Sequence, residues 1–300
     1  MSDRWVAPAP MLARIAGRLG AALARPTQTY IPLLVQDRVV GWMTPPRARR
    51  LAEWPDIFRF TADRVECAAS LATPAARTAA FDAVARELAK ENALTAWRDE
   101  RYGVAASSSE TALFTIERAA ARYFGIHTYA AHVNGLVRDG ARALMWLARR
   151  SPTKPIDPGL LDNLVGGGIA AGTSVEATIV RESWEEAGIE TERAHLAKPA
   201  GAVHICRDQP DGLQRETIYV HDLWLPADFA PANQDGEAIE HRLSTPDEVL
   251  AVIATDDVTA DASLVILDFL LRHGHVLPHD PSFAALEELR RRSTASPHGG

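Results

Sequence analysis

The stretch GGGIAAGTSVEATIVRESWEEAGI, residues 166–189, decides the fold of this chain. Thr173 followed by Glu176 forms a capping-box pattern, and Gly188 is a typical residue just past a helix end. We therefore expect a helix of about four turns between them. Its apolar stripe, spaced by three or four residues, consists of Ala177, Val180, Trp184 and Ala187. Three acidic residues share the opposite side: Glu182, Glu185 and Glu186.

The three glutamates need a counter-charge. Like charges at this spacing destabilise a helix by about 0.2 to 0.5 kcal/mol per pair, and Arg181 is the local basic residue. Grouped carboxylate oxygens suit Mg²⁺ or Mn²⁺, whereas Zn²⁺ prefers His or Cys. The triple glycine leaves room for a phosphate to approach the backbone. A solvated acidic face is the alternative reading, but the combination favours metal-dependent diphosphate chemistry.

The same stretch resembles the Nudix box, G-x5-E-x7-R-E-U-x-E-E-x-G-U, where U is a bulky aliphatic residue. Seven positions match without a gap: Gly167, Arg181, Glu182, Glu185, Glu186, Gly188 and Ile189. Thr173 replaces the first Glu, and Ser183 replaces the first U. The resemblance implies that the three glutamates hold the metal ions. It also implies a catalytic role for Glu182 and for Arg181, which would orient a glutamate by a salt bridge.

A wider resemblance covers nearly the whole chain. Residues 124–137 and 149–172 are similar to Nudix proteins related to the domain attached to thiamine pyrophosphokinase. Those proteins carry an additional N-terminal domain, and LTAWRDERYGV, residues 94–104, looks like the signature that closes it. The resemblance implies hydrolysis of oxidised thiamine diphosphate analogues to monophosphates, as a form of metabolite repair.

Further site residues are expected on both sides of the box. An additional catalytic carboxylate should come from a loop beyond it, with Glu240 preferred, Glu237 second and Glu216 a weaker option. An acidic protein that binds a diphosphate needs local positive charge. The substrate-binding residues predicted on these grounds are Arg149, Arg150, Lys154, Gly167 and Gly168.

Composition excludes several classes of protein. The chain has 300 residues, 47% hydrophobic and 24% charged, which is typical of a soluble globular protein. Its 39 acidic and 32 basic residues give a net charge of −7, which argues against nucleic acid as a partner. No apolar run approaches the length of a membrane span. The two cysteines form no metal or disulfide pattern, so we expect a cytoplasmic protein.

We expect an α+β protein: a Nudix α/β/α sandwich with a mixed sheet, at residues 111–292, after a smaller N-terminal α+β domain at residues 1–110. Residues 293–300 should be a disordered tail. The first 25 residues predict an amphipathic helix, which either packs on the body of the protein or serves as a presequence; we favour packing. The predicted activity is a Mg²⁺- or Mn²⁺-dependent hydrolysis of a small-molecule diphosphate. The alternative is a Nudix domain that senses a nucleotide or thiamine derivative. The sequence does not determine the oligomeric state, and a homodimer is one alternative.

Overall fold

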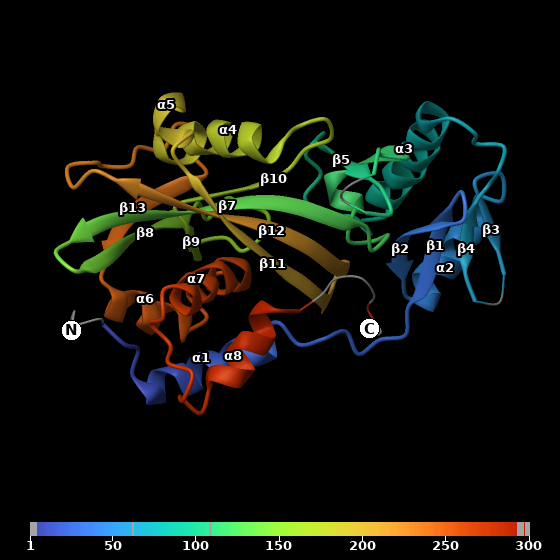
Figure 1. Ribbon diagram of the computed structural model, residues 1–300. Helices are drawn as coiled ribbons and strands as arrows, with labels where there is room; N and C mark the ends of the chain where they lie inside the picture. The colour runs from blue at the N-terminus through green and yellow to red at the C-terminus, as the bar shows by residue number, and fades with distance from the viewer. Residues whose placement is uncertain (1–4, 62, 108–109, 293–296, 298–300) are drawn as a thin grey trace.

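The computed structural model describes residues 5–61, 63–107, 110–292 and 297, so all of the predicted tail except Pro297 lies outside the described residues. The first sheet has the strand order β2-β1-β4-β3. Its strands are β1 (Ile31–Val35), β2 (Arg38–Met43), β3 (Phe58–Phe60) and β4 (Val65–Cys67). A tight turn joins β1 to β2, with φ of 52° at Gln36 and 60° at Asp37, as hairpins of this twist require. Helices α2 (Pro45–Arg50) and α3 (Pro74–Lys90) and the short 3₁₀ segment Leu51–Glu53 complete this layer (Figure 1).

A second, two-stranded sheet pairs β5 (Arg101–Val104) with β6 (Phe114–Glu117). In β6, Phe114 and Ile116 alternate into the core with the period of two that defines a strand. A 3₁₀ turn, Arg118–Ala120, follows. The boundary predicted at residue 110 lies between these two paired strands, and the same hydrophobic cluster continues to Ile126. We call residues 26–126 the N-terminal domain and the remainder the second domain.

The second domain is built on one mixed sheet. Its main path runs β11 (Lys198–Gln209), β12 (Gly212–Leu225), β7 (His127–Asp139), β8 (Arg142–Arg150) and β13 (Ala238–Ser244). The short strands β10 (Val165–Gly168) and β9 (Leu161–Asn163) pair with β7 and β8. Strands β12 and β7 run parallel, and the other pairs are antiparallel.

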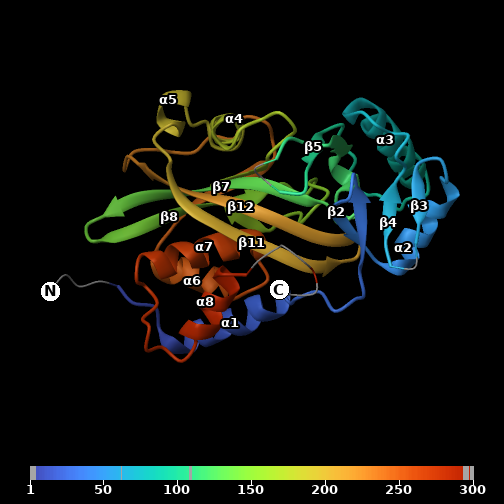
Figure 2. The same ribbon diagram turned by 45° about the vertical axis from the view of Figure 1, so that its right-hand side comes forward.

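Helices cover both faces of this sheet. Helices α4 (Val175–Ala187) and α5 (Thr191–Ala194) lie on one face. The other face carries α6 (Pro246–Ile253), α7 (Ala260–Arg272), α8 (Phe283–Arg290) and α1 (Ala9–Ala22), as Figures 1 and 2 show. The predicted α/β/α sandwich with a smaller N-terminal α+β domain is thereby confirmed. No helix in the described parts of the chain has the length and apolar character needed to cross a bilayer.

Helix α1 packs on the second domain, as predicted for an amphipathic N-terminal helix. Leu12, Ile15 and Leu19 are buried in the same cluster as the apolar residues of α6, α7 and α8. Arg18 donates hydrogen bonds to the Ser263 hydroxyl (2.7 Å) and to the carbonyl of Val258 (2.6 Å). The first helix of the chain therefore belongs in space to the second domain, not to the N-terminal one.

The two domains are joined by direct backbone and side-chain bonds. The Ala171 N–H donates to the Arg101 carbonyl (2.8 Å), and the Leu213 N–H donates to the Arg122 carbonyl (2.9 Å). The Tyr30 hydroxyl donates to the Asp208 carboxylate at 2.5 Å. The loop before α4 and the start of β12 are thus tied to the N-terminal domain.

Candidate active site

Helix α4 is delimited by a cap and a left-handed glycine. Ser174 is the N-cap, because its hydroxyl accepts a hydrogen bond from the N–H of Ala177 (3.0 Å). The prediction that Thr173 caps the helix is therefore wrong by one residue. Thr173 instead closes the preceding turn, where its N–H donates to the Ala170 carbonyl. Gly188 has a φ of 63° and ends the helix as predicted.

The buried face of α4 differs from the predicted apolar stripe. Trp184 is 51% exposed, whereas Glu182 and Glu186 are only 8% and 9% exposed. The buried side chains are Thr178, Ile179, Glu182, Ser183, Glu186 and Ala187. The stripe rule assumes that apolar residues face inward. Here two of the glutamates face inward: Glu186 contacts β10, and Glu182 lines a cleft.

The glycines of β10 let the helix approach this closely. The Gly166 N–H donates to Glu186 Oε2 at 2.8 Å. A Cβ atom added at Gly167 would collide with the Glu182 carboxylate, and one added at Gly168 would collide with the Tyr102 hydroxyl. Gly167 and Gly168, both predicted substrate-binding residues, do line the cleft.

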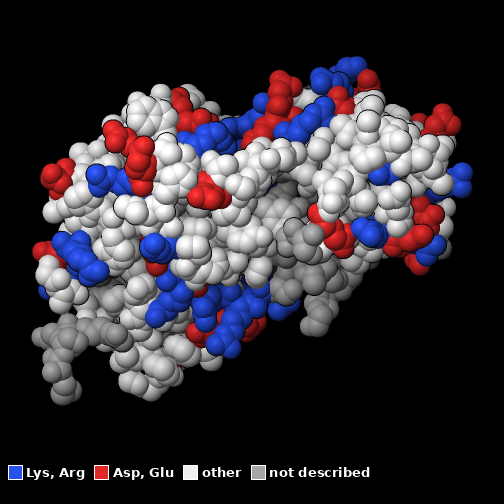
Figure 3. Space-filling view, turned by 45° about the horizontal axis from the view of Figure 1, so that its top comes forward, with Lys and Arg blue, Asp and Glu red and all other residues white. Residues whose placement is uncertain are grey.

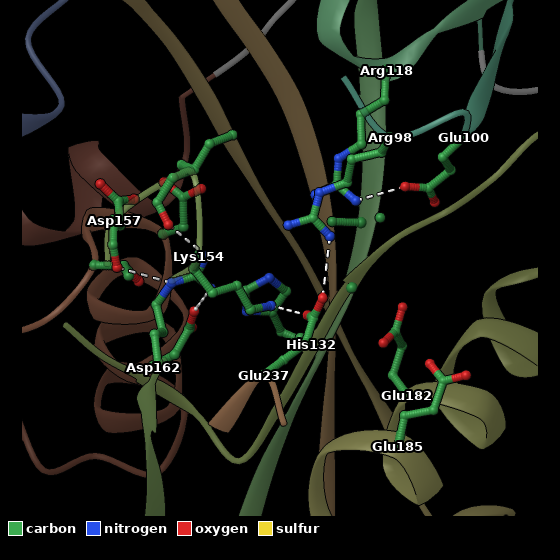
Figure 4. Close-up of a pocket in the computed structure, with 18 of the residues that line it drawn as sticks. Arg98, Glu100, Arg118, His132, Lys154, Asp157, Asp162, Glu182, Glu185 and Glu237 are labelled. Carbon is green, nitrogen blue, oxygen red and sulfur yellow. Dashed lines mark hydrogen bonds and ion pairs between the residues drawn. The ribbon is translucent and has the colours of Figure 1, made fainter. Parts of the chain in front are cut away.

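The cleft has a volume of about 210 Å³ and lies between the two domains. In Figure 4, Glu182 and Glu185 reach in from α4 while Arg98 and Arg118 reach in from the N-terminal domain. Of the described residues that line it, six are basic: Arg98, Arg118, Arg122, Arg150, Lys154 and Arg181. Nine are acidic: Glu100, Asp157, Asp162, Glu182, Glu185, Glu216, Asp235, Glu237 and Asp261. Basic and acidic side chains also lie side by side along the upper edge of the face in Figure 3.

Two of the glutamates of α4, Glu182 and Glu186, have raised pKa values. Burial raises the pKa of Glu182 to about 7, against the lowering effect of the Arg181 guanidinium. Burial and then the charge of Glu182 raise the pKa of Glu186 well above its ordinary value. Arg181 donates to Glu182 Oε1 (2.6 Å) and Glu185 Oε2 (2.8 Å), the orienting salt bridge predicted for it. The neighbouring basic side chains therefore do not fully offset the burial of these two carboxylates.

The donor set fits a hard divalent cation. Only carboxylate oxygens are offered by Glu182, Glu185 and Glu186, and these are the ligands that Mg²⁺ and Mn²⁺ prefer. A cation would also offset the two buried charges whose pKa values are raised. Within the described residues, no three His, Cys, Asp or Glu side chains stand close enough together to hold a metal ion as they are.

Three predicted residues do not line the cleft: Arg149, Glu240 and Glu186, the last of which is buried against Gly166. Arg149 makes paired hydrogen bonds of 3.0 Å to the Asp257 carboxylate. Glu240, the preferred catalytic carboxylate, has a side chain 57% exposed and pairs with Arg149 at 3.5 Å. The β13–β8 pairing is irregular between Ala238 and Glu240 and places Glu240 opposite Arg149.

Glu237, the second choice for the additional catalytic carboxylate, lines the cleft together with Lys154 and Arg150. Glu237 accepts hydrogen bonds from Lys154 and from Arg98 Nη1, the latter at 3.2 Å. Burial acts to raise the pKa of Glu237, but the bonds from these two cations hold it below its ordinary value. Glu237 is therefore an ionised carboxylate at the edge of the α4 cluster.

Several lining residues were not identified from the sequence. Arg98 and Glu100 lie inside the segment 94–104, whose resemblance to a family signature predicts no role for either residue. Arg118 donates to Glu100 Oε2 at 2.7 Å, and both come from the N-terminal domain. Glu216, the weaker option, lines the floor, where burial and then Asp261 raise its pKa. No short-range sequence pattern predicts a site role for Arg118 or Asp261, because both are far from residues 166–189 in sequence and come near them only in the folded protein.

Comparisons with known proteins agree with this geometry. The family model described as "Domain of unknown function (DUF4743)" matches residues 18–128, and the NUDIX domain model matches residues 128–265. Nudix hydrolase 20, chloroplastic, of Arabidopsis thaliana is 37% identical over 274 residues, which are 88% of this chain and 73% of that protein. Nudix hydrolase 24, chloroplastic, of the same plant is 37% identical over 270 residues, 89% of this chain and 74% of that protein.

Among solved structures, DR0079 from Deinococcus radiodurans is 25% identical with a TM-score of 0.42, over 57% of this chain and 98% of that one. The family assignment rests on the plant relatives and on the match of the NUDIX model around Glu182, Glu185 and Glu186. The chain therefore belongs to the Nudix hydrolase family, and its Nudix domain follows an N-terminal domain of the DUF4743 type.

Proposed function

We propose that the cleft hydrolyses a small-molecule diphosphate with Mg²⁺ or Mn²⁺ and that the preferred substrate is thiamine diphosphate or an oxidised analogue, cleaved to the monophosphate and phosphate. The observation that carries the diphosphate proposal is the placement of Glu182 and Glu186. Glu182 lines a cleft together with Lys154, Arg98 and Arg118. Glu186 is buried beside it, with its Oε1 3.9 Å from Lys154 Nζ.

The side chains divide the chemistry between them. When bound, a divalent cation supplies charge neutralisation for the diphosphate and activation of a water. Glu182, with a pKa of about 7, is suited to accept a proton near neutral pH. Arg181 holds its carboxylate in place (2.6 Å). Lys154, Arg150 and Arg118 offer positive charge to the phosphate oxygens.

The proposal of a heterocyclic substrate has support in a neighbouring cavity. A cavity of about 330 Å³ is lined by Tyr102, Tyr129 and Tyr219 and by the loop before α4. The Tyr129 and Tyr219 rings are nearly parallel, with centroids 6.4 Å apart. Such rings offer a stacking surface for a planar heterocycle. The choice of thiamine among heterocycles rests on the resemblance to the domain attached to thiamine pyrophosphokinase.

A substrate panel tests the proposal. The full chain is incubated with thiamine diphosphate, its oxo form, ADP-ribose, NADH and dinucleoside polyphosphates, each with Mg²⁺, Mn²⁺ or EDTA. We expect metal-dependent loss of substrate, measured by chromatography, fastest with the thiamine compounds and lost in Glu182→Gln. Glu176→Gln, on the exposed side of the same helix and 2.9 Å from His195, is the matched control. Faster cleavage of ADP-ribose would reject the thiamine proposal, and binding without cleavage would favour the sensing alternative.

A further inference from the structure

A strained loop of the N-terminal domain lies beside the cleft. Ala96 and Asp99 have φ values of 61° and 57°, in the left-handed region that residues other than glycine seldom adopt. The two residues flank Trp97 and Arg98. Strain of this kind persists only where the surroundings impose it, and it gathers at functional positions. This loop is the centre of the segment 94–104.

Contacts on the N-terminal domain hold the loop in this conformation. The Trp97 ring packs against the domain's hydrophobic cluster, and its Nε1–H donates to Asp99 Oδ1 at 2.8 Å. The Arg86 guanidinium lies 5.1 Å from the centre of the same ring. The backbone N–H of Arg98 donates to Oε1 of the buried Glu117 at 3.0 Å. Trp97 is thus fixed to its own domain, while Arg98 is presented to the other.

The Arg98 side chain crosses to the Nudix domain and meets Glu237. Its Nη1 donates to Glu237 Oε1 at 3.2 Å, and Lys154 donates to Oε2 of the same carboxylate (Figure 4). Lys154 is also 3.9 Å from Glu186 Oε1. One cation from each domain therefore holds one oxygen of Glu237, next to the acidic face of α4.

Stability alone does not explain this arrangement. The side chains of Arg98 and Glu237 are 28% and 33% exposed, and ion pairs with that much solvent contact stabilise a fold little. Two left-handed residues in one short loop cost more than such a pair returns. The strain is better explained by a need for Arg98 at this point of the cleft.

We propose that Arg98 is a positioning residue that the N-terminal domain supplies to the Nudix site. Arg98 fixes the Glu237 carboxylate, and Glu237 in turn holds the Lys154 ammonium away from Glu186. The side chains of the cleft therefore reach this arrangement only when the two domains are in contact. This inference rests on the proposed diphosphate hydrolysis and deepens it, because it gives the N-terminal domain a part in turnover.

The test compares Arg98→Ala, Arg98→Lys and the control Arg64→Ala, which removes an exposed guanidinium of the N-terminal domain that pairs with Glu66 and does not line the cleft. Each is made in the full chain and assayed with the best substrate of the panel. We expect Arg98→Ala to lower kcat about tenfold or more with KM within about twofold, since loss of positioning acts on the reacting centre. Arg98→Lys should recover part of the rate, and Arg64→Ala should match the wild type.

A double-mutant cycle with Glu237→Gln identifies the route. If Arg98 acts through Glu237, then Arg98→Ala lowers kcat no further in the Glu237→Gln background. An equal rise of KM in both backgrounds would mean that Arg98 binds substrate directly and would overturn the inference. So would an unchanged kcat accompanied only by a lower melting temperature, which is the mark of a structural role.

Circular dichroism and thermal unfolding establish that each variant is folded. Should Arg98→Ala fail to fold, Arg98→Met keeps the aliphatic stem and decides the matter by the same kcat criterion. Absence of turnover by the wild type on the whole panel would reject the proposed function, and the role of Arg98 with it. Turnover by the wild type and equal turnover by Arg98→Ala would reject the role of Arg98 alone.

Discussion

Replacing Glu182 by Gln should stabilise the metal-free protein at neutral pH. In the folded state, burial raises the pKa of Glu182 from 4.5 to about 7. The folded state therefore binds the proton more tightly than the unfolded state, and stability is lost as pH rises from about 4.5 to about 7. At about 1.4 kcal/mol per pKa unit, this shift corresponds to roughly 3 kcal/mol. The glutamine carries no charge, so the variant should escape this loss.

The assay is urea unfolding in EDTA at pH values from 4 to 9. The free energy of unfolding of Glu182→Gln should exceed that of the wild type by up to roughly 3 kcal/mol at pH 8, with the difference vanishing near pH 4. Glu176→Gln, on the exposed side of α4, should follow the wild type. With Mn²⁺ in place of EDTA, the free energy of unfolding should rise more for the wild type than for Glu182→Gln. A pH-independent difference between the two proteins would refute the burial of this charge.

Four further predictions follow from the packing. Ser174→Ala should lower the free energy of unfolding by about 1 kcal/mol in urea, because it removes the cap of α4, whereas Thr173→Ala should change it by less than about 0.5 kcal/mol; equal effects would contradict the cap assignment. Gly167→Ala should fold but lose turnover about tenfold or more, because its Cβ displaces the Glu182 carboxylate; wild-type kinetics would count against that contact. Burial acts to raise the pKa of Asp222, but hydrogen bonds from His273, Arg272 and Asn134 lower it to about 2. The free energy of unfolding of the wild type should therefore fall by about 2 kcal/mol as the pH falls from 3.8 to 2, and that of Asp222→Asn should not. Acid unfolding of both proteins measures this difference. Deleting residues 1–110 should give no folded monomer by size-exclusion chromatography and circular dichroism, because it removes the partner of β6 and the helix that covers α6 to α8; a folded monomer would disprove that dependence.

Local signals predicted the parts of the fold that depend on neighbouring residues. Gly188 ends α4 because a left-handed residue is needed there. The spacing of Leu12, Ile15 and Leu19 predicted a packed α1. In each case the period or the turn chemistry is contained in a short stretch of chain.

Other features depend on contacts that no short stretch contains. The outward position of Trp184 follows from the cleft on the opposite side of α4, which overrides the apolar pattern. Glu237 precedes β13 and reaches the cleft, whereas Glu240 lies within the strand and pairs with Arg149 outside the cleft. Arg98 is far from the box in sequence and meets it only because two domains dock.

The course of the chain also sets the order in which the protein can assemble. Arg18 of α1 bonds to residues 235 to 245 positions further along the chain. A ribosome therefore makes α1 first and its partners α6, α7 and α8 last, with the whole N-terminal domain emerging in between. The N-terminal domain can fold early on its own local contacts, while closing the second domain requires a loop of more than two hundred residues, a slow event of high contact order. In the interval, the apolar side of α1 is exposed, and a nascent chain needs either a chaperone or a transient partner to cover it.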